Sequence, residues 1–203
     1  SIVCLFYNGT SYKLTGKDME MYYKDGSKYE VKLTDASDKP LANKAIKIDI
    51  NGNIYQRTTN NEGKASIAIN LNPGTSTLIA FYPDKDFAYC ENTVLIKSTI
   101  SGDDIVKYYR NDTQYYATFL NTNGQLLKNT KIQFNINGIL YERTTNDQGT
   151  AKMNINLGEG EYIITATNPV NGETHSNKIT VLGILEGNDL TKYYRNDSQY
   201  YIT

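Results

Sequence analysis

Apolar and polar residues alternate with a period of two along most of the chain. Ile46, Ile48 and Ile50, for example, alternate with Lys47 and Asp49. This period puts every second side chain on the same face of a β-strand, so one face of each strand is predicted to be buried and the other solvated. No segment shows helical apolar spacing over three turns. The pattern therefore predicts an all-β protein with antiparallel sheets that are covered on one side.

The chain repeats itself. Residues 50–60 read INGNIYQRTTN, and residues 136–146 read INGILYERTTN, an offset of 86 residues. A third copy opens at residues 192–201 with KYYRNDSQYY, which matches KYYRNDTQYY at 107–116. A period this long exceeds that of short solenoid repeats and fits a string of small domains. We therefore predict two full units and the start of a third.

Turn sequences separate the predicted strands. Asp25-Gly26 and the matching Asn111-Asp112 suit tight hairpins, as do Asn51-Gly52 and Asn137-Gly138. The turn at residues 60–63 and its copy at 146–149 each end in a glycine placed for positive φ. Seven strands are predicted in unit one, at about 18–23, 28–34, 44–50, 53–59, 64–71, 76–82 and 92–97. This number favours a two-sheet sandwich over the alternative of a closed barrel.

The repeat also resembles a known family. The strings YQRTTNNEGKA (55–65), INLNPG (69–74), IITATNP (163–169), NKITV (177–181) and GNDLTKYY (187–194) are similar to immunoglobulin-like repeats of adhesin-like surface proteins of methanogenic archaea. The resemblance covers nearly the whole chain after residue 11. It implies tandem immunoglobulin-like β-sandwich domains in an extracellular, cell-surface protein, where the modules form a stalk or an adhesive surface.

The domain boundaries follow from the repeat. The four predicted parts are an N-terminal extension at 1–10, immunoglobulin-like domain 1 at 11–100, immunoglobulin-like domain 2 at 101–184, and a truncated third repeat at 185–203. The linkers at residues 98–104 and 183–188 are too short for free swivelling, which predicts a semi-rigid rod. Residues 193–203 lack partner strands and are expected to be frayed or paired with a neighbouring molecule.

Composition and charge limit the function. The chain has 21 Lys+Arg, 22 Asp+Glu and a net charge of -1, which argues against a nucleic-acid or acidic-membrane binder. No apolar run is long enough for a membrane span, and the first residues do not read as a signal peptide. One His and two Cys cannot form a multi-His metal site or a zinc cluster. His175 is expected to be solvated in a polar loop, and we expect no catalytic residue, cofactor or metal.

Two other chemistries receive little support. Acidic residues near the unit starts, at Asp18, Asp103-Asp104 and Asp189, supply too few oxygen ligands in close order for calcium and read as solvated linkers. Lys–Asn or Thr–Gln crosslinks need a buried acid beside the pair, and the sequence offers no such candidate.

Cys4 and Cys90 form a candidate disulfide. The bond would join the first and last strands of unit one, stabilise it by about 4–5 kcal/mol, and suit an oxidising exterior. The alternative is two unrelated thiols, because unit two has no Cys pair. The offset of 86 residues also allows the two cysteines to hold equivalent places in different units.

Three sequons are candidate glycosylation sites, at Asn8, Asn111 and Asn196. The alternative is turn chemistry, since Asn is favoured at such corners.

Tyrosine pairs are the candidate contact residues. They are Tyr22-Tyr23, Tyr108-Tyr109 and Tyr115-Tyr116. Adjacent residues face opposite sides of a strand, so one of each pair should be buried and the other exposed. An exposed Tyr suits contact with proteins and sugars, whereas the alternative is cross-strand packing or the junction with a neighbouring unit.

Taken together, the sequence predicts a non-catalytic module of a cell-surface adhesin-like protein. Its partners would be the neighbouring immunoglobulin-like repeats and a cell-surface protein or glycan, without nucleic acid. The alternatives are a pure structural spacer and an accessory module of a cell-wall-degrading enzyme.

Overall fold

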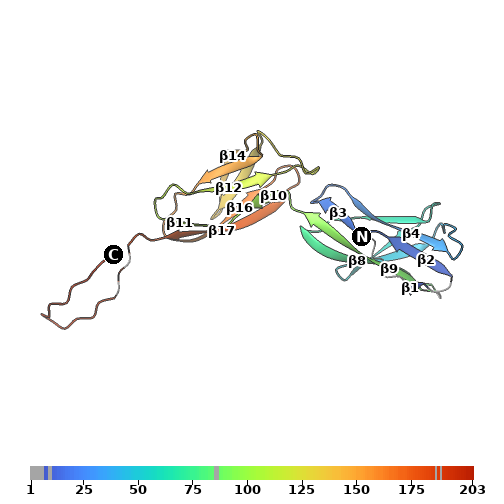
Figure 1. Ribbon diagram of the computed structural model, residues 1–203, viewed down its shortest axis with the longest axis horizontal. Helices are drawn as coiled ribbons and strands as arrows, with labels where there is room; N and C mark the ends of the chain where they lie inside the picture. The colour runs from blue at the N-terminus through green and yellow to red at the C-terminus, as the bar shows by residue number, and fades with distance from the viewer. Residues whose placement is uncertain (1–6, 9–10, 85–86, 186, 188) are drawn as a thin grey trace. The chain divides into compact units, whose positions relative to one another are not determined.

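The computed structural model describes residues 7–8, 11–84, 87–185, 187 and 189–203 (Figure 1). The chain divides into two compact units. Unit 1 comprises Ser1–Thr99 with Thr122–Gly124, and unit 2 comprises Ile100–Asn121 with Gln125–Thr203. The described residues contain strands and no helix.

Unit 1 has a large and a small sheet. The large sheet has the order β1-β9-β8-β5-β6, and β3 also pairs with β9. Its strands are β1 (Tyr7–Asn8), β3 (Met19–Tyr22), β5 (Ala45–Ile50), β6 (Asn53–Thr58), β8 (Gly74–Tyr82) and β9 (Ala88–Lys97). The small sheet has the order β2-β4-β7, with β2 (Tyr12–Gly16), β4 (Lys28–Asp35) and β7 (Lys64–Ala68).

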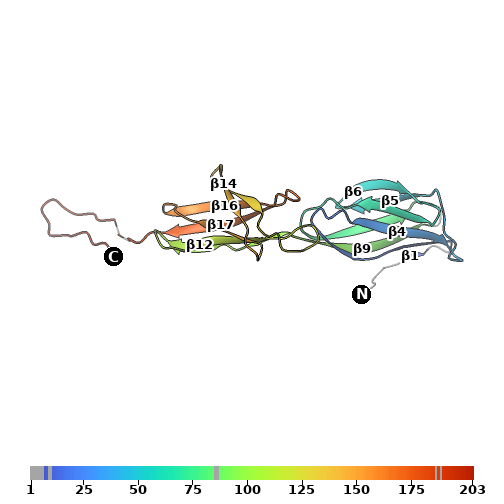
Figure 2. The same cartoon turned by 90° about the horizontal axis from the view of Figure 1, so that it is seen from above.

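Unit 2 repeats this plan (Figures 1 and 2). Its large sheet has the order β11-β17-β16-β13-β14, formed by β11 (Ile105–Tyr108), β17 (Thr174–Leu182), β16 (Gly160–Thr167), β13 (Lys131–Ile136) and β14 (Ile139–Thr144). Its small sheet has the order β10-β12-β15, with β10 (Ile100–Gly102), β12 (Gln114–Phe119) and β15 (Thr150–Asn154). The predicted fold class, all-β with tandem immunoglobulin-like sandwiches, is confirmed.

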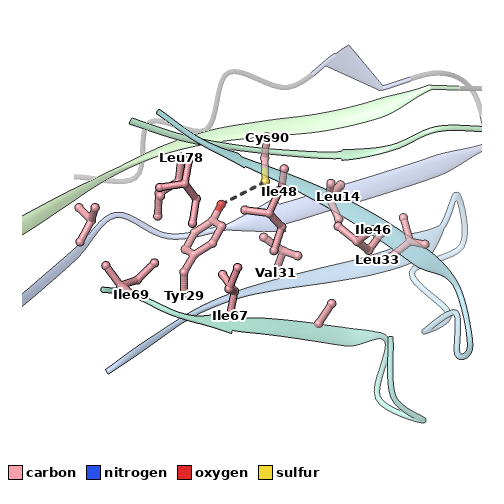
Figure 3. Close-up of a cluster of buried hydrophobic side chains, with 14 of the residues drawn as sticks. Leu14, Tyr29, Val31, Leu33, Ile46, Ile48, Ile67, Ile69, Leu78 and Cys90 are labelled. Carbon is pink, nitrogen blue, oxygen red and sulfur yellow. Dashed lines mark hydrogen bonds between the residues drawn. The ribbon is translucent and has the colours of Figure 1, made fainter. Parts of the chain in front are cut away.

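The core of each unit lies between its two sheets. In unit 1, Leu14, Val31 and Leu33 of the small sheet pack with Ile46 and Ile48 of the large sheet (Figure 3). The alternating residues Ile46, Ile48 and Ile50, which the sequence assigned to the inner face, are all buried, whereas Leu14 lies in a strand that the sequence did not predict. A separate cluster, which includes Phe119, Phe134 and Ile164, fills unit 2.

The first strand of each unit is split between the sheets. β2 pairs antiparallel with β4 in the small sheet, and the chain then crosses so that β3 pairs parallel with β9 in the large sheet. β10 and β11 do the same in unit 2. The sequence prediction missed β2 and β10, and the proposed linker at residues 98–104 is wrong because Ile100–Gly102 forms β10. Short strands beside a crossover contain too few alternating residues to be recognised.

Two of the four predicted hairpins are correct. Asn51-Gly52 joins the paired strands β5 and β6 with φ values of 52° and 84°, and Asn137-Gly138 does so for β13 and β14 with 52° and 81°. Asp25-Gly26 and Asn111-Asp112 instead connect strands of different sheets, so these turns cross the sandwich. The backbone also differs, because both residues of each hairpin turn have positive φ, whereas the crossing turns have positive φ at Lys24 and Gly26 or at Arg110. The predicted positive φ of Gly63 and Gly149 is also confirmed, at 74° and 70°.

The two terminal segments differ in their pairing. In the predicted extension at 1–10, Tyr7 and Asn8 pair with Tyr89 and Ala88 of β9. At the other end, one isolated bridge joins Gly187 to Ile202, and Tyr193 and Tyr194 are 87% and 88% exposed.

Candidate functional site

A polar cluster of two buried side chains and one exposed carboxylate fixes the strand crossing in unit 1. The hydroxyl of Tyr29 donates to Asn92 Oδ1 at 2.7 Å, and Asn92 Nδ2 donates to Asp18 Oδ1 at 3.2 Å. The backbone N–H of Thr93 also donates to Asp18 Oδ1, at 2.9 Å. We call Tyr29, Asn92 and Asp18 the strand-switch cluster of unit 1. It ties β4, β9 and the β2–β3 crossing together.

Unit 2 contains the matching cluster. The hydroxyl of Tyr115 donates to Asn177 Oδ1 at 2.7 Å, and Asn177 Nδ2 donates to Asp104 Oδ1 at 3.1 Å. The N–H of Lys178 donates to Asp104 Oδ1 at 2.8 Å. Burial raises the pKa of Tyr115 to about 12, and the nearby Asp103 and Asp104 carboxylates add to the shift.

These contacts correct the interpretation of Asp18 and Asp104 as merely solvated linker residues. Each carboxylate accepts a backbone N–H of the last strand, and this bond is the main cause that lowers the pKa of both groups, with the Asn amide second. The repeated Gly-x-Asp at 16–18 and 102–104 was the available sequence signal. A Cβ at Gly102 would lie 2.5 Å from the Tyr115 hydroxyl and 2.8 Å from Asn177 Oδ1. The cluster therefore requires glycine there.

A groove lies beside each strand switch. In unit 1 it has a volume of about 490 Å³ and is lined by Thr15, Gly16, Lys17, Asp18, Met19, Lys28, Tyr29, Glu30, Val31, Lys32 and Lys64. In unit 2 it has a volume of about 320 Å³ and is lined by Ile100, Ser101, Gly102, Asp103, Tyr116, Thr118 and His175. The two grooves occupy equivalent places, but their side chains differ in charge.

His175 belongs to a strand, in contrast to the predicted polar loop. It is the second residue of β17 and pairs with Ala166. Its Nε2 lies 3.3 Å from the carbonyl oxygen of Gly102. The described residues contain no group of three His, Cys, Asp or Glu side chains arranged to hold a metal ion.

The tyrosine pairs differ in their placement. Tyr115 is fully buried and Tyr116 is 53% exposed, in the alternation that the sequence indicated for adjacent strand residues. Tyr108 is 58% exposed, whereas Tyr109 packs against the core of unit 2. In unit 1, Tyr23 packs against the core, and Lys97 Nζ lies 5.4 Å from the centre of the Tyr22 ring. The structure places Tyr108 and Tyr116 as the exposed members of their pairs.

An aromatic cluster on unit 1 escaped the sequence analysis. Phe81 and Tyr89 are cross-strand partners on β8 and β9, and Phe87 lies just before β9. The ring centres of Phe81 and Phe87 are 5.8 Å apart, and those of Phe87 and Tyr89 are 6.0 Å apart. Phe87 is 43% exposed. We call these three residues the aromatic cluster. Unit 2 has Thr167, Gly172 and Thr174 at the corresponding positions, since Thr167 pairs with Thr174 as Phe81 pairs with Tyr89. The alternation of β8 and β9 already put Phe81 and Tyr89 on the outer face, but only strand pairing brings them together.

The cysteine prediction falls partly outside the described residues, because Cys4 is not among them. Cys90 is fully buried on β9, where its Sγ lies 3.7 Å from the Tyr29 hydroxyl (Figure 3). β1 begins three residues after Cys4 and pairs with Tyr89, the neighbour of Cys90. The disulfide stays a prediction.

The sequon asparagines serve the turns. Asn111 Oδ1 accepts the N–H of Thr113 at 3.2 Å, and Asn196 Oδ1 accepts the N–H of Ser198 at 3.1 Å. Asp25 makes the same bond to Ser27 in unit 1, at 2.8 Å. Both Asn side chains are exposed. Asn8 lies in β1, and the rest of its sequon is outside the described residues.

A buried lysine was also missed. Lys107, on β11, is 3% exposed, and its Nζ donates to the carbonyl oxygens of Asn111 at 2.7 Å and Ile155 at 2.8 Å. Unit 1 has the buried Met21 at this position. Because lysine is usually exposed, a lysine on the apolar face of a strand looks like an interruption of the alternating pattern. The sequence therefore contained no signal that Lys107 is buried.

Three comparisons with known proteins were made for this chain. A family model, macroglobulin domain MG4, matches residues 15–92. No curated protein matches the chain. In the described part of the chain, we find no helix of the length and apolarity that a membrane span requires.

Among solved structures, the fibronectin(III)-like modules of Clostridium thermocellum CbhA share 17% identity with this chain, with a TM-score of 0.32, covering 84% of this chain and 94% of that one. The Yersinia pseudotuberculosis adhesin InvE shares 14%, with a TM-score of 0.34, covering 83% and 58%. A Ca²⁺-stabilised, ice-binding adhesin of an Antarctic bacterium shares 12%, with a TM-score of 0.29, covering 88% and 51%. At these TM-scores the likeness carries no argument, and the fold assignment depends on the strand pairing described above.

Proposed function

We propose that the chain is a non-catalytic module of an extracellular, adhesin-like cell-surface protein. Its job in this proposal is to hold contact surfaces on a rigid β-scaffold. The similarity of its repeats to those of methanogen adhesin-like proteins supports this role and suggests an origin of that kind.

The observation that carries the proposal is a shared framework with different exposed surfaces. Both units keep the strand-switch cluster, the glycine beside it and the same hairpin turns. Only unit 1 has the aromatic cluster, with Phe87 43% exposed. Exposed aromatic side chains are enriched where proteins contact other proteins and suit stacking on sugars. The two units therefore share one β-scaffold but expose different side chains. This is expected of modules that present different contact surfaces to their partners.

The test is adhesion of the purified chain to whole cells and to a panel of immobilised glycans. Phe87→Glu replaces the exposed ring with a charged side chain, and Tyr194→Glu is a matched control, because Tyr194 is 88% exposed in the C-terminal segment. Binding lost in Phe87→Glu and kept in Tyr194→Glu supports adhesion through unit 1. Wild-type protein that binds neither cells nor glycans contradicts the adhesive proposal and favours a spacer. Hydrolysis of a wall polymer by the purified chain contradicts the non-catalytic assignment.

We also propose that residues 185–203 begin a third unit. Gly187 forms a β-bridge with Ile202, just as Gly102 pairs with Ala117 in unit 2. A Cβ added at Gly187 would collide with the Tyr200 hydroxyl, and a Cβ added at Gly102 would collide in the same way with the Tyr115 hydroxyl. Lys192 Nζ donates to the carbonyl oxygen of Ser198 at 3.3 Å, which parallels the bond of Lys107 to Thr113. A chain extended to the length of a complete third unit should protect Lys192 from chemical modification. If Lys192 reacts equally in both lengths, the proposal fails.

A further inference from the structure

Lysines gather on the outer face of the small sheet in unit 1. Thr15 on β2 is the Cα partner of Lys32 on β4, and Lys32 is in turn the partner of Lys64 on β7. Lys28 lies on the same face of β4, four residues before Lys32, and Lys17 follows β2 at the strand switch. These four lysines line the groove of about 490 Å³, which we call the lysine groove.

The groove keeps a net positive charge, because its lining has four lysines and two acids, Asp18 and Glu30. Lys64 pairs with Glu62 at 3.1 Å and Glu30 at 3.7 Å. Across the described residues, Lys17, Lys28 and Lys32 have no carboxylate within ion-pair distance. Asp18 also lines the groove and keeps its negative charge, while its Oδ1 accepts bonds from Thr93 and Asn92. Three exposed ammonium groups therefore face solvent in one open groove.

Unit 2 shows that the scaffold does not require these lysines. Asp103, Gln114, Thr118 and Thr150 stand at the positions of Lys17, Lys28, Lys32 and Lys64. The residues that line the groove of unit 2 include no lysine. The whole chain has a net charge of -1, so the lysine groove is a local concentration of charge on a nearly neutral protein.

We propose that the lysine groove binds an anionic polysaccharide that carries sulfate, phosphate or carboxylate groups. Charge complementarity requires an anion, and separate ammonium groups act as point charges that suit anions spaced along a polymer. Nucleic acid is less suited, because Tyr29, the one aromatic residue that lines the groove, is buried and cannot stack on bases. The open groove suits an extended chain. This inference goes beyond the proposed adhesive function and does not depend on the aromatic cluster.

The experiment measures binding of the full 203-residue chain to a sulfated, a uronate and a neutral oligosaccharide of equal length, and to single-stranded DNA. One variant combines Lys17→Gln, Lys28→Gln, Lys32→Gln and Lys64→Gln. The control combines Lys24→Gln, Lys39→Gln, Lys44→Gln and Lys152→Gln, all exposed and outside the groove, with the same change in net charge. Circular dichroism verifies that both variants are folded.

We expect an anionic oligosaccharide to bind and the neutral one not to bind. The groove variant should bind about ten-fold or more weakly, and wild-type binding should fall by a similar factor between about 50 and 200 mM salt, as expected when several cations contact a polyanion. The control variant should bind like the wild type. Backbone NMR shifts on titration should centre on Thr15 and Val31, which gives a location independent of the variants.

Three results would overturn the proposal. The first is that neither anionic oligosaccharide binds at low salt. The second is that the groove variant and the control variant lose equal affinity for the oligosaccharide. The third is that single-stranded DNA binds more tightly than any oligosaccharide. Because the Phe87→Glu variant leaves all four lysines in place, failure of the adhesive proposal and failure of this one are separable.

Discussion

Removing the Tyr115 hydroxyl tests whether the strand-switch cluster stabilises unit 2. Tyr115→Phe keeps the ring, which is 0% exposed and packs edge-to-face on Phe134 at 5.6 Å. It removes the 2.7 Å bond to Asn177 Oδ1. Asn177 is 8% exposed, and its amide nitrogen stays bonded to Gly102 and Asp104. The oxygen is then left without the donor it has in the wild type.

The expected cost is about 1–3 kcal/mol, because a buried acceptor that loses its partner suffers the full desolvation penalty. The assay is urea unfolding followed by hydrogen exchange and mass spectrometry, which reports the peptides of each unit separately. Unit 1 is the internal reference, and Tyr108→Phe is the surface control, with an expected change below about 0.5 kcal/mol. If unit 2 of Tyr115→Phe unfolds within that margin of the wild type, the cluster does not contribute in the way we infer.

The same residue predicts an alkaline transition. The pKa of Tyr115 is raised to about 12 in the folded state from 10.0, so folding favours the neutral phenol. Its contribution is fully present below pH 10 and is lost as the pH rises through 12. Tyr115→Phe should therefore make the stability of unit 2 less dependent on pH in this window. An unchanged dependence would contradict the inference.

Three further predictions concern the strand switch and the cysteines. Gly102→Ala should destabilise unit 2 by about 1–3 kcal/mol, because its Cβ would overlap the cluster, and unit-resolved hydrogen exchange in urea measures this. The folded-state pKa of Asp104 lies below 3.8, so its stabilisation is present above that pH and is lost as the pH falls through the folded value. Asp104→Asn should therefore flatten the acid dependence of unit 2, and a curve like that of the wild type would argue against the carboxylate bond. Non-reducing peptide mapping should recover a fragment that links Cys4 to Cys90, whereas alkylation of both thiols without reduction would refute the disulfide.

Much of the fold could be predicted from local sequence. Alternation at Ile46, Ile48 and Ile50 identified both the strand and its buried face, because the period of two is a property of extended backbone alone. The Asn51-Gly52 turn was predictable for a similar reason, since Asn and Gly tolerate the positive φ that a two-residue hairpin requires.

The candidate surfaces were less predictable. Tyr29 and Asn92 lie 63 residues apart and meet only after β4 and β9 pack face to face. Lys107 interrupts an apolar face, and its bonds to Asn111 and Ile155 exist only when the β11–β12 crossing and β15 come together. Local patterns contain no information on such pairs.

The sequence by itself determined that this protein is made of β-strands, that it repeats, and where most of its tight turns fall, because these depend on neighbouring residues and on backbone sterics. Tertiary structure alone decided which turns are hairpins and which cross between sheets, and it alone showed the split first strand. It also decided the charge distribution. A net charge of -1 indicated no basic surface, yet strand pairing puts Lys32 beside Lys64 and brings Lys17 and Lys28 to the same groove. Net charge is a sum over the chain, whereas a partner meets only the charges that folding gathers on one face.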